Sequence, residues 1–396
     1  MKRKICFITG SRAEYGLLRK LVIASQQDKL INMQIIVTGS HLSKKHGHTY
    51  KEIEQDHIQI SSKVNLNFKG DSPEDIIHSM SIGLKGFSNS FKKLQPDLIV
   101  ILGDRYEIFS AAAAAMIMNI PIAHIHGGEV TEGAYDEAIR HSISKMAHIH
   151  FVAAPEYRKR VIQLGENPKS VFMVGGLGVD AINDLSLLDK LELEKSMNFK
   201  FGQRNLLVTI HPETLKTKQQ QLKNLKSLLA ALRNIKETNF IFTTPNADHF
   251  NEQIAHLIQE FCLKNSNNCS LFSSLGQLKY FSALQFVDGV IGNSSSGLLE
   301  VPSFKKGTIN LGKRQDGRLK AGSIIDCDFD KNNILKAIKK LYSKSFQAKL
   351  SLSSNPYGAP GATLKIHNKI STIPLNSLLQ KKFYDLKGNL GSQYER

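Results

Sequence analysis

The sequence predicts an α/β protein made of two doubly wound, Rossmann-type domains. Short and nearly continuous apolar runs recur along the chain, each followed by Gly or Ser, as in strands buried on both faces of a parallel sheet. Segments with helical periodicity separate these runs. The pattern stops at a bridge rich in Lys and Leu, residues 181–204, and then begins again.

The first predicted domain covers residues 1–180. It begins with a strand over residues 4–10, a helix over 14–27 and a strand over 33–39, which we interpret as leading into a polar loop. Four further strands are expected, at 96–103, 120–128, 148–154 and 170–176. Helices are expected between them, at 107–119, 135–147 and 155–165.

The second predicted domain covers residues 181–363 and repeats this order. Its strands are expected at 205–212, 239–246, 269–275, 286–293 and 307–312, with helices at 223–237, 252–265 and 278–284. A loop at 354–362 and a helix at 364–370 follow, and we expect the segment 364–396 to pack back on the first domain. Two such domains face each other across a cleft between the carboxyl ends of both sheets, where ligands usually bind.

The composition suits a folded cytoplasmic protein. The 396 residues are 41% hydrophobic and 22% charged. The longest apolar stretch, residues 108–125, contains Asn119 and Pro121 and so does not predict a membrane span. The formal net charge of +17 permits an anionic substrate, but the basic residues are spread along the chain without a nucleic-acid-binding motif. Four scattered cysteines without a CxxC pair predict no metal site.

The stretch GNSSSG, residues 292–297, predicts an anion-binding turn. The apolar run before it ends at Ile291, and a helix is expected to begin near Ser296. Unpaired backbone N–H groups at a helix N-terminus attract phosphate, and serine hydroxyls add donors. A single capping serine is the alternative, but the chain offers Ser294, Ser295 and Ser296 together. We therefore favour anion binding.

Glu300 extends this prediction to a nucleotide. It lies one to two turns beyond the serines, where a carboxylate can accept hydrogen bonds from a ribose diol. The two features together predict a nucleoside diphosphate. The chain contains no GxGxxG or P-loop pattern, which disfavours a nicotinamide cofactor and phosphoryl transfer from ATP.

Charged residues also follow several predicted strands of the first domain. Asp104 and Arg105 follow the strand that ends at Gly103, and a buried salt bridge between them is the structural alternative to a ligand site. Glu129 follows the turn HGG, in which glycines let the backbone approach a ligand. Asp136 lies near the start of the next helix, where a surface ion pair with Arg140 is the alternative.

Histidines require separate treatment. His148 and His150 alternate along a strand and are interpreted as packing residues. His211 differs because it ends the first strand of the second domain and should face the cleft, within the motif HPET.

The motifs GSRAEYG, GDRYE, HIHGGE, YDEAIRHSISKMA, RVIQLGE, HPET, GNSSSGLLEVP and NLGKRQDGR occur in this order, and the match extends from residue 1 to about residue 375. Together they resemble the hydrolysing UDP-N-acetylglucosamine 2-epimerases of bacterial sialic acid biosynthesis. The resemblance implies a GT-B-like fold and release of UDP from UDP-GlcNAc to give N-acetylmannosamine. It further implies no metal or nicotinamide cofactor, and a homodimer or homotetramer.

The resemblance also implies roles for individual residues. The GNSSSG serines would hold the diphosphate and Glu300 the ribose. Arg314 corresponds to a basic residue near the nucleotide, Arg12 to one that reaches across from the first domain, and Arg105 is a further substrate-binding candidate. Asp104, Glu129 and Asp136 correspond to the carboxylates around the sugar, and His211 lies beside the phosphates.

Removal of the weakly acidic C2 proton of the sugar requires a positioned base and a stabilised leaving group. Asp104, Glu129 and Asp136 are the candidates for proton transfer, and the sequence does not assign base and acid among them. Three alternatives stay open. Related enzymes act on UDP-linked 2,4-diacetamido-trideoxy sugars for legionaminic acid or on GDP sugars, and the motifs GDRYE and GAYDEAIRH favour GlcNAc. A GT-B glycosyltransferase and a non-catalytic nucleotide-sugar sensor are the others.

Overall fold

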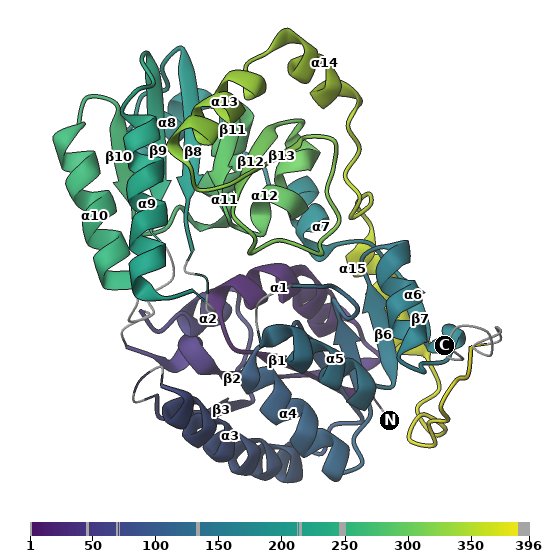
Figure 1. Ribbon diagram of the computed structural model, residues 1–396. Helices are drawn as coiled ribbons and strands as arrows, with labels where there is room; N and C mark the ends of the chain where they lie inside the picture. The colour runs from purple at the N-terminus through teal and green to yellow at the C-terminus, as the bar shows by residue number, and fades with distance from the viewer. Residues whose placement is uncertain are drawn as a thin grey trace, which may run out of the picture.

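The computed structural model describes residues 2–44, 47–68, 70, 72–131, 135–211, 213, 216–244 and 251–386. It confirms an α/β protein with two parallel sheets, stacked one above the other in the view of Figure 1. The first sheet is formed by β1 (Arg3–Thr9), β2 (Ile31–Thr38), β3 (Ser62–Val64), β4 (Leu98–Leu102), β5 (Ile122–Ile125), β6 (Ile149–Val152) and β7 (Val171–Met173).

The first sheet has the strand order β3-β2-β1-β4-β5-β6-β7, and all its pairs are parallel. The chain reverses direction along the sheet between β1 and β4, which makes the loops after these two strands the expected place for ligands. Alternate residues of β1 point to opposite faces. Ile5 and Phe7 belong to one apolar cluster, and Cys6 and Ile8 belong to another.

Different helices cover the two faces of the first sheet. One face packs against α1 (Arg12–Gln27), and the other packs against α3 (Pro73–Leu94), α4 (Tyr106–Ile117) and α5 (Asp136–Met146). A further helix, α6 (Pro155–Gln163), contacts β6 and β7 near the edge.

The second sheet repeats the order of the first, as β10-β9-β8-β11-β12-β13. Its strands are β8 (Arg204–Thr209), β9 (Thr238–Thr243), β10 (Cys269–Phe272), β11 (Gly289–Gly292), β12 (Gly307–Leu311) and β13 (Ile324–Cys327). One face packs against α9 (Lys218–Leu232), α10 (Asn251–Lys264) and α13 (Lys331–Leu341), and the other against α8 (Lys190–Met197) and α11 (Gly276–Phe286). The direction reversal lies between β8 and β11.

Several elements were missing from the prediction. The segment interpreted as a polar loop after β2 contains β3 and the 22-residue helix α3. In the sequence of α3, charged and polar residues alternate with the apolar ones, so the apolar face that includes Phe87 and Phe91 is not visible as a continuous run. In the second domain, the prediction lacked the edge strand β13 and the helices α13 and α14 (Lys344–Leu352). These segments also have no strong apolar run. Both missed strands are short edge strands of three and four residues.

The chain passes between the domains twice, at neighbouring places. The first crossing leads into α7 (Leu177–Asp184), and the second leads into α15 (Ala362–Thr372). The Gly176 N–H donates to the Tyr357 carbonyl at 2.8 Å, and the Asp180 carboxylate accepts hydrogen bonds from three backbone N–H groups at the start of α15. Ile366 and Ile370 of α15 belong to the same apolar cluster as β1.

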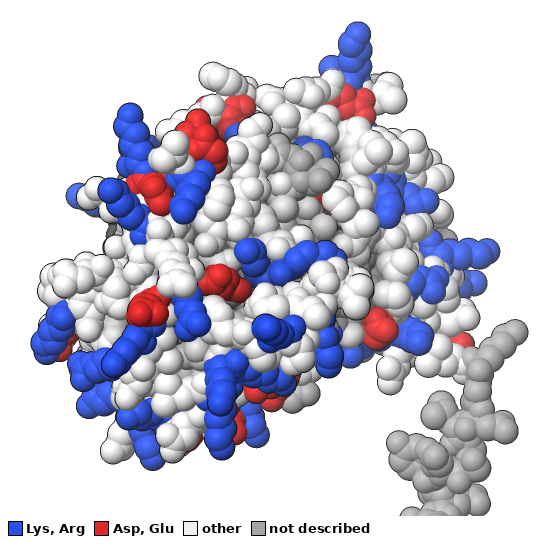
Figure 2. Space-filling view, turned by 90° about the horizontal axis from the view of Figure 1, so that it is seen from above, with Lys and Arg blue, Asp and Glu red and all other residues white. Residues whose placement is uncertain are grey.

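The distribution of charge on the surface and the apolarity of the helices concern possible nucleic-acid and membrane partners. Figure 2 shows Lys and Arg side chains spread over the face seen from above, with Asp and Glu between them. In the part of the chain that the structure describes, no helix is both long and apolar enough to cross a membrane.

Candidate active site

A cavity of about 160 Å³ lies between the two domains, at the carboxyl edges of both sheets. Loops after β4 and β5 line it from the first domain, and residues after β11 and β12 line it from the second. Four residues that the sequence singled out are among its lining residues: Asp104, Glu129, Ser295 and Glu300. The cavity also contains His126, Arg140, Arg318 and Tyr357, to which the sequence analysis gave no role in the site.

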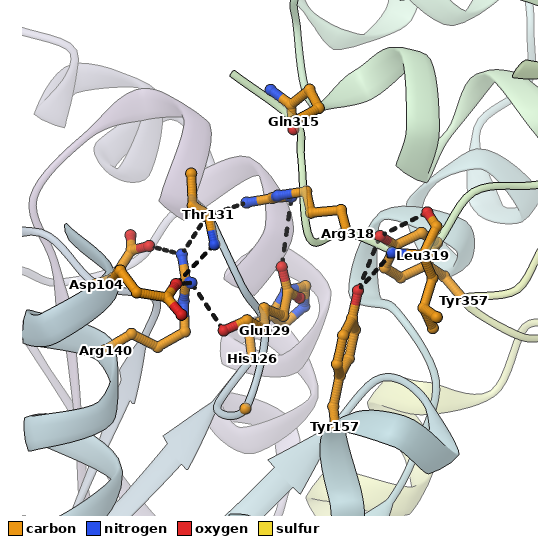
Figure 3. A network of polar contacts seen from close by, with 12 residues as sticks. Asp104, His126, Glu129, Thr131, Arg140, Tyr157, Gln315, Arg318, Leu319 and Tyr357 are labelled. Carbon is orange, nitrogen blue, oxygen red and sulfur yellow. Dashed lines mark hydrogen bonds and ion pairs between the residues drawn. The ribbon is translucent and has the colours of Figure 1, made fainter. Parts of the chain in front are cut away.

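Asp104 forms its salt bridge with Arg140 of α5, and Arg105 is paired elsewhere. The alternative of a salt bridge between Asp104 and Arg105 is therefore wrong, because the partner of Asp104 is Arg140. Arg140 is only 2% exposed, so the alternative of a surface ion pair is wrong as well. Arg140 also donates to the Glu129 carbonyl and to Thr131 Oγ1, both at 3.0 Å, and thereby joins the loops after β4 and β5 (Figure 3).

Glu129 lies in a buried turn and is 3% exposed. His126 Nδ1 lies 2.9 Å from Glu129 Oε1, and Arg318 Nη1 of the second domain lies 3.4 Å from Oε2. Burial alone raises the pKa of Glu129, but Arg318 and His126 outweigh it and hold this pKa below its ordinary value. Glu129 is therefore ionised at neutral pH.

The sequence HGG is required by the geometry of this turn. Gly128 has φ +76°, and a Cβ there would lie 2.4 Å from the Tyr157 carbonyl oxygen. His126 itself has φ +67°, which is uncommon for a residue with a side chain and is found repeatedly at functional sites. The turn therefore holds His126 and Glu129 in fixed places at the end of β5.

Glu300 approaches the cavity from the second domain. It is 9% exposed, burial raises its pKa, and Oε2 has no hydrogen-bond partner among the described residues. A Cβ at Gly178 would lie 2.5 Å from Glu300 Oε1, so glycine permits α7 to contact this carboxylate. A buried acceptor without a partner is costly unless a ligand supplies the donor.

The serines of GNSSSG differ in their surroundings. Ser295 lines the cavity, whereas the Ser296 hydroxyl lies 2.6 Å from the Tyr280 hydroxyl. The Ser294 carbonyl accepts from the Gly297 N–H at 3.2 Å. The expected helix does begin at Ser296, but α12 (Ser296–Leu299) has only four residues. Its dipole is therefore small, and local N–H groups and hydroxyls are the donors that this turn can offer.

His211, Asp136 and Arg314 form a second group beside the cavity. Asn293 joins this group to the serines, since its side chain accepts from the His211 N–H at 2.7 Å and donates to the His211 carbonyl at 2.8 Å. Arg314 Nη1 donates to the Asn293 carbonyl at 2.9 Å. Burial, and then Arg314, lower the pKa of His211 to about 3, so its imidazole is neutral. Pro212 and Thr214 of HPET lie outside the described residues.

Asp136 shares the electrostatic environment of this second group. Burial raises the pKa of Asp136, and the charges of Arg105 and Arg314 oppose that shift. An aspartic acid whose pKa is raised in this way retains a proton more readily than an exposed one.

Two predicted binding residues, Arg12 and Arg105, have other partners. Arg105 Nε lies 2.5 Å from Glu107 Oε1 and 3.9 Å from Glu14 Oε1. Arg12 donates to Ser274 Oγ, so it does reach from the first domain to the second, although it does not line the cavity.

Arg318 is the main residue that the sequence analysis did not select. It lies in the quoted motif NLGKRQDGR, but the resemblance pointed to Arg314. The Arg318 side chain is 11% exposed, and its Nε is a buried donor without a hydrogen-bond partner among the described residues. Arg140 and Arg318 both contact Thr131 Oγ1, at 3.0 and 3.4 Å. Burial and then Arg318 lower the pKa of Arg140 to about 9, which leaves Arg140 charged at neutral pH.

The arrangement combines acid–base groups with donors for an anion. Carboxylates of the first domain face Ser295, Glu300 and Arg318 of the second across a small, enclosed space. Cations and free N–H groups in such a space stabilise a developing negative charge more strongly than they would in water. The cavity is therefore suited to removing a proton from a substrate while an anionic group departs.

Comparisons with known proteins show which family the chain resembles. The family described as UDP-N-acetylglucosamine 2-epimerase matches residues 23–371. The chain is 43% identical to the GDP/UDP-N,N'-diacetylbacillosamine 2-epimerase (hydrolyzing) of Campylobacter jejuni, covering 97% of this chain and 100% of that one. It is 41% identical to the polysialic acid biosynthesis protein P7 of Escherichia coli, covering 97% and 98%.

Solved structures of low identity share the fold. UDP-GlcNAc 2-epimerase from Neisseria meningitidis bound to UDP-GlcNAc superimposes with a TM-score of 0.80 at 19% identity, covering 93% of this chain and 99% of that one. A putative UDP-N-acetylglucosamine 2-epimerase from Listeria monocytogenes gives a TM-score of 0.78 at 20% identity, covering 93% and 96%. These similarities confirm the GT-B-like arrangement of two Rossmann-type domains.

Proposed function

The chain belongs to the UDP-N-acetylglucosamine 2-epimerase family, and from this premise we propose that it is a hydrolysing enzyme. It converts UDP-GlcNAc and water to N-acetylmannosamine and UDP, a step that supplies a precursor of sialic acid. The observation that supports the proposal most directly is the cavity in which Asp104 and Glu129 face Ser295, Glu300 and Arg318.

The reaction proceeds in two balanced steps. First, a carboxylate takes the C2 proton of the sugar, the C2–H electrons form a C1=C2 double bond, and the C1–O bond breaks with its electrons leaving on UDP. Water then adds to the glycal: its oxygen bonds to C1 and gives one of its protons to a carboxylate. The C1=C2 electrons take up a proton at C2, on the face opposite to the one that lost its proton in the first step. The released sugar therefore has the manno configuration.

Glu129 is the preferred base in this proposal because it is ionised and lies in the cavity. Its low pKa would make it a weak base in the empty enzyme. An entering diphosphate competes with Glu129 for Arg318, which is the first of the charged groups that depress the pKa of Glu129. Binding of the nucleotide thus raises the basicity of Glu129 at the moment when a base is needed.

Asp104 and Asp136 are the candidates for the second proton transfer. Asp104 lines the cavity and is oriented by Arg140. Asp136 has a raised pKa, which favours a proton donor. The neutral His211 beside Arg314 can accept or donate a hydrogen bond near the leaving group.

The nucleotide is held mainly by the second domain. Arg318 Nε and the turn that contains Ser295 provide donors for the diphosphate, with Arg314 next to them. Glu300 Oε2 provides an acceptor for a ribose hydroxyl. These interactions lower the cost of negative charge on departing UDP.

A second substrate has support from the relatives. Two of them, at 43% and 32% identity, are named N,N'-diacetylbacillosamine 2-epimerases (hydrolyzing). The same reaction on a UDP-linked 2,4-diacetamido-trideoxy sugar is therefore the second candidate function. It uses the same bonds and the same carboxylates, and differs in the substituents at C4 and C6.

Proton NMR in deuterated water tests both candidates. The purified chain is incubated separately with UDP-GlcNAc, with the UDP-linked diacetamido sugar and with GDP sugars. We expect free UDP and N-acetylmannosamine carrying deuterium at C2. Preferential turnover of the diacetamido sugar would select the second candidate. Intact nucleotide sugars in every sample would overturn the hydrolysing function and leave a transferase or a sensor.

A further inference from the structure

Two buried tyrosines form a closed set of hydrogen bonds with the backbone next to Arg318 (Figure 3). The Tyr157 and Tyr357 hydroxyl oxygens lie 3.0 Å apart. The Leu319 N–H donates to the Tyr157 hydroxyl at 3.3 Å, and the Tyr357 hydroxyl donates to the Leu319 carbonyl at 3.3 Å. Both tyrosines are 0% exposed, although their positions in the sequence differ by 200 residues.

One arrangement of protons satisfies all three contacts. Because Tyr357 donates to the Leu319 carbonyl, it must accept from Tyr157, and Tyr157 then accepts from the Leu319 N–H. Each hydroxyl donates once and accepts once. Loss of either hydroxyl therefore breaks two of the three links and leaves a part-buried polar group of Leu319 without its partner.

Tyr157 belongs to a helix that also contacts the turn of Glu129. Its carbonyl oxygen packs against Gly128, and Arg160 of the same helix donates to the Gly128 carbonyl. Helix α6 therefore touches both sides of the ion pair between Glu129 and Arg318.

Tyr357 is fixed by both domains. Its N–H donates to the Asn355 side chain at 3.0 Å, and its carbonyl accepts from the Gly176 N–H at 2.8 Å. The Asn355 side chain in turn donates to the Leu299 carbonyl, directly before Glu300, at 2.7 Å. The tyrosine pair thus joins the first domain, the crossing segment and the nucleotide side of the cavity.

We propose that Tyr157 and Tyr357 are positioning residues that hold Arg318 in the cavity, where it engages Glu129 in the empty enzyme and the diphosphate in the loaded one. The inference rests on the proposed function, because it gives Arg318 a role toward the departing UDP. Burial raises the pKa of both phenols, so they stay protonated and act as hydrogen-bonding groups.

The test is a double-mutant cycle on UDP release. Tyr157→Phe, Tyr357→Phe, Arg318→Ala and the double variant Tyr157→Phe/Arg318→Ala are compared with the parent chain. Tyr342→Phe is the matched control, because its hydroxyl donates to Asp288 at 3.3 Å, at the amino end of β11 and away from the cavity. Each variant is measured for kcat, KM and melting temperature.

We expect Tyr157→Phe to lower kcat/KM about tenfold, mainly through kcat, in the presence of Arg318. In the Arg318→Ala background the same change should cost less than about twofold, because the group that it positions is absent. Tyr342→Phe should retain the parent kinetics. An equal loss in both backgrounds, or parent kinetics for Tyr157→Phe, would overturn the inference.

Hydrogen exchange separates this inference from the proposed function. The Leu319 amide should exchange faster in Tyr157→Phe than in the parent, whether or not the enzyme turns over. If the parent releases no UDP, the proposed function fails, and the same cycle is then measured on the Kd for UDP. Additive effects on this Kd, or no binding of UDP by the parent chain, would overturn the positioning role as well.

Discussion

Glu129 and Glu166 are two buried glutamates of the first domain, 3% and 1% exposed, and both have a lowered pKa. Glu166 is fully paired: Oε1 lies 2.8 Å from Lys145 Nζ, and Oε2 lies 3.0 Å from His150 Nε2 and 2.8 Å from Lys381 Nζ. The Glu129 carboxylate pairs with His126 from its own turn, and the only Lys or Arg side chain that pairs with it, among the described residues, is Arg318 from the other domain.

The surroundings of the two carboxylates explain their different roles. Arg318 Nε, Glu300 Oε2 and His126 Nε2 are buried near Glu129 without hydrogen-bond partners among the described residues. A folding unit that needed only stability would satisfy such groups, as the site around Glu166 does for its carboxylate. We infer that Glu129 serves to bind or act on a ligand, whereas Glu166 serves to stabilise the folded protein.

The largest effect should come from Glu129→Gln. We expect kcat to fall by about 10³-fold because a general base is removed, while the amide keeps the shape of the side chain. UDP release in the presence of saturating substrate measures this effect, and circular dichroism confirms the fold. A loss below about tenfold would show that Asp104 or Asp136 is the base.

Replacement of Arg318 should give the next largest effect. Arg318→Gln removes a cation from the leaving group, and we expect a loss of about 10²-fold in kcat. It also removes the largest of the charge effects that hold down the pKa of Glu129, so this pKa should rise. The acidic limb of kcat/KM should therefore move to higher pH in the variant. An acidic limb at the parent position would mean that it belongs to a different group.

Glu166→Gln should affect stability and leave chemistry intact. Burial alone raises the pKa of Glu166, but His150, Lys145 and Lys381 lower it from 4.5 to about 2. Because the folded pKa is depressed, the stabilisation is present above about pH 4.5 and is lost as the pH falls toward 2.

We expect this variant to lose about 2–3 kcal/mol of unfolding free energy at neutral pH, and the difference should narrow below pH 4.5. Urea unfolding at several pH values measures the difference, and kcat should stay within twofold of the parent value, roughly the scatter of such assays. A large loss of kcat in the folded variant would contradict the structural role.

The smallest expected effect is that of Lys381→Met. Lys381 extends from the segment after α15 and donates to the Lys145 and Ala147 carbonyls, at 2.5 and 2.7 Å, as well as to Glu166. Lys145 still pairs with Glu166 in the variant, so we expect a loss of about 1 kcal/mol. Lys382→Met is the control because that neighbour is exposed. Equal melting temperatures for the two variants would show that the tail does not stabilise this cluster.

The sequence predicted the elements that consist of apolar runs and missed those that depend on their neighbours. The central strands are buried on both faces and therefore visible as continuous apolar segments. The edge strands β3 and β13 and the helix α3 expose one side to solvent, and their short or interrupted patterns carry a weaker signal.

The site shows a similar division. Asp104 and Glu129 follow strands, and a residue at a strand end is placed by local sequence alone. Arg140 pairs with Asp104 and Arg318 pairs with Glu129, so the positions of both arginines depend on segments that are distant in sequence. The structure places Asp104 and Glu129 in the cavity and Asp136, His211 and Arg314 beside it, and the roles of all these residues stay predictions.

The two neighbouring crossings have a consequence for topology. Asp180 lies in α7, where the chain leaves the first domain, and its carboxylate accepts hydrogen bonds from the N–H groups of Gly361, Ala362 and Thr363, where the chain returns. We infer that the segment between these two places, which forms the second sheet, is an insertion whose two ends are held together by these hydrogen bonds. Joining residue 180 to residue 361 should leave the first domain closed on itself. On the proposed function, exchange of this insertion would replace the nucleotide-binding residues together while Asp104 and Glu129 stay in place.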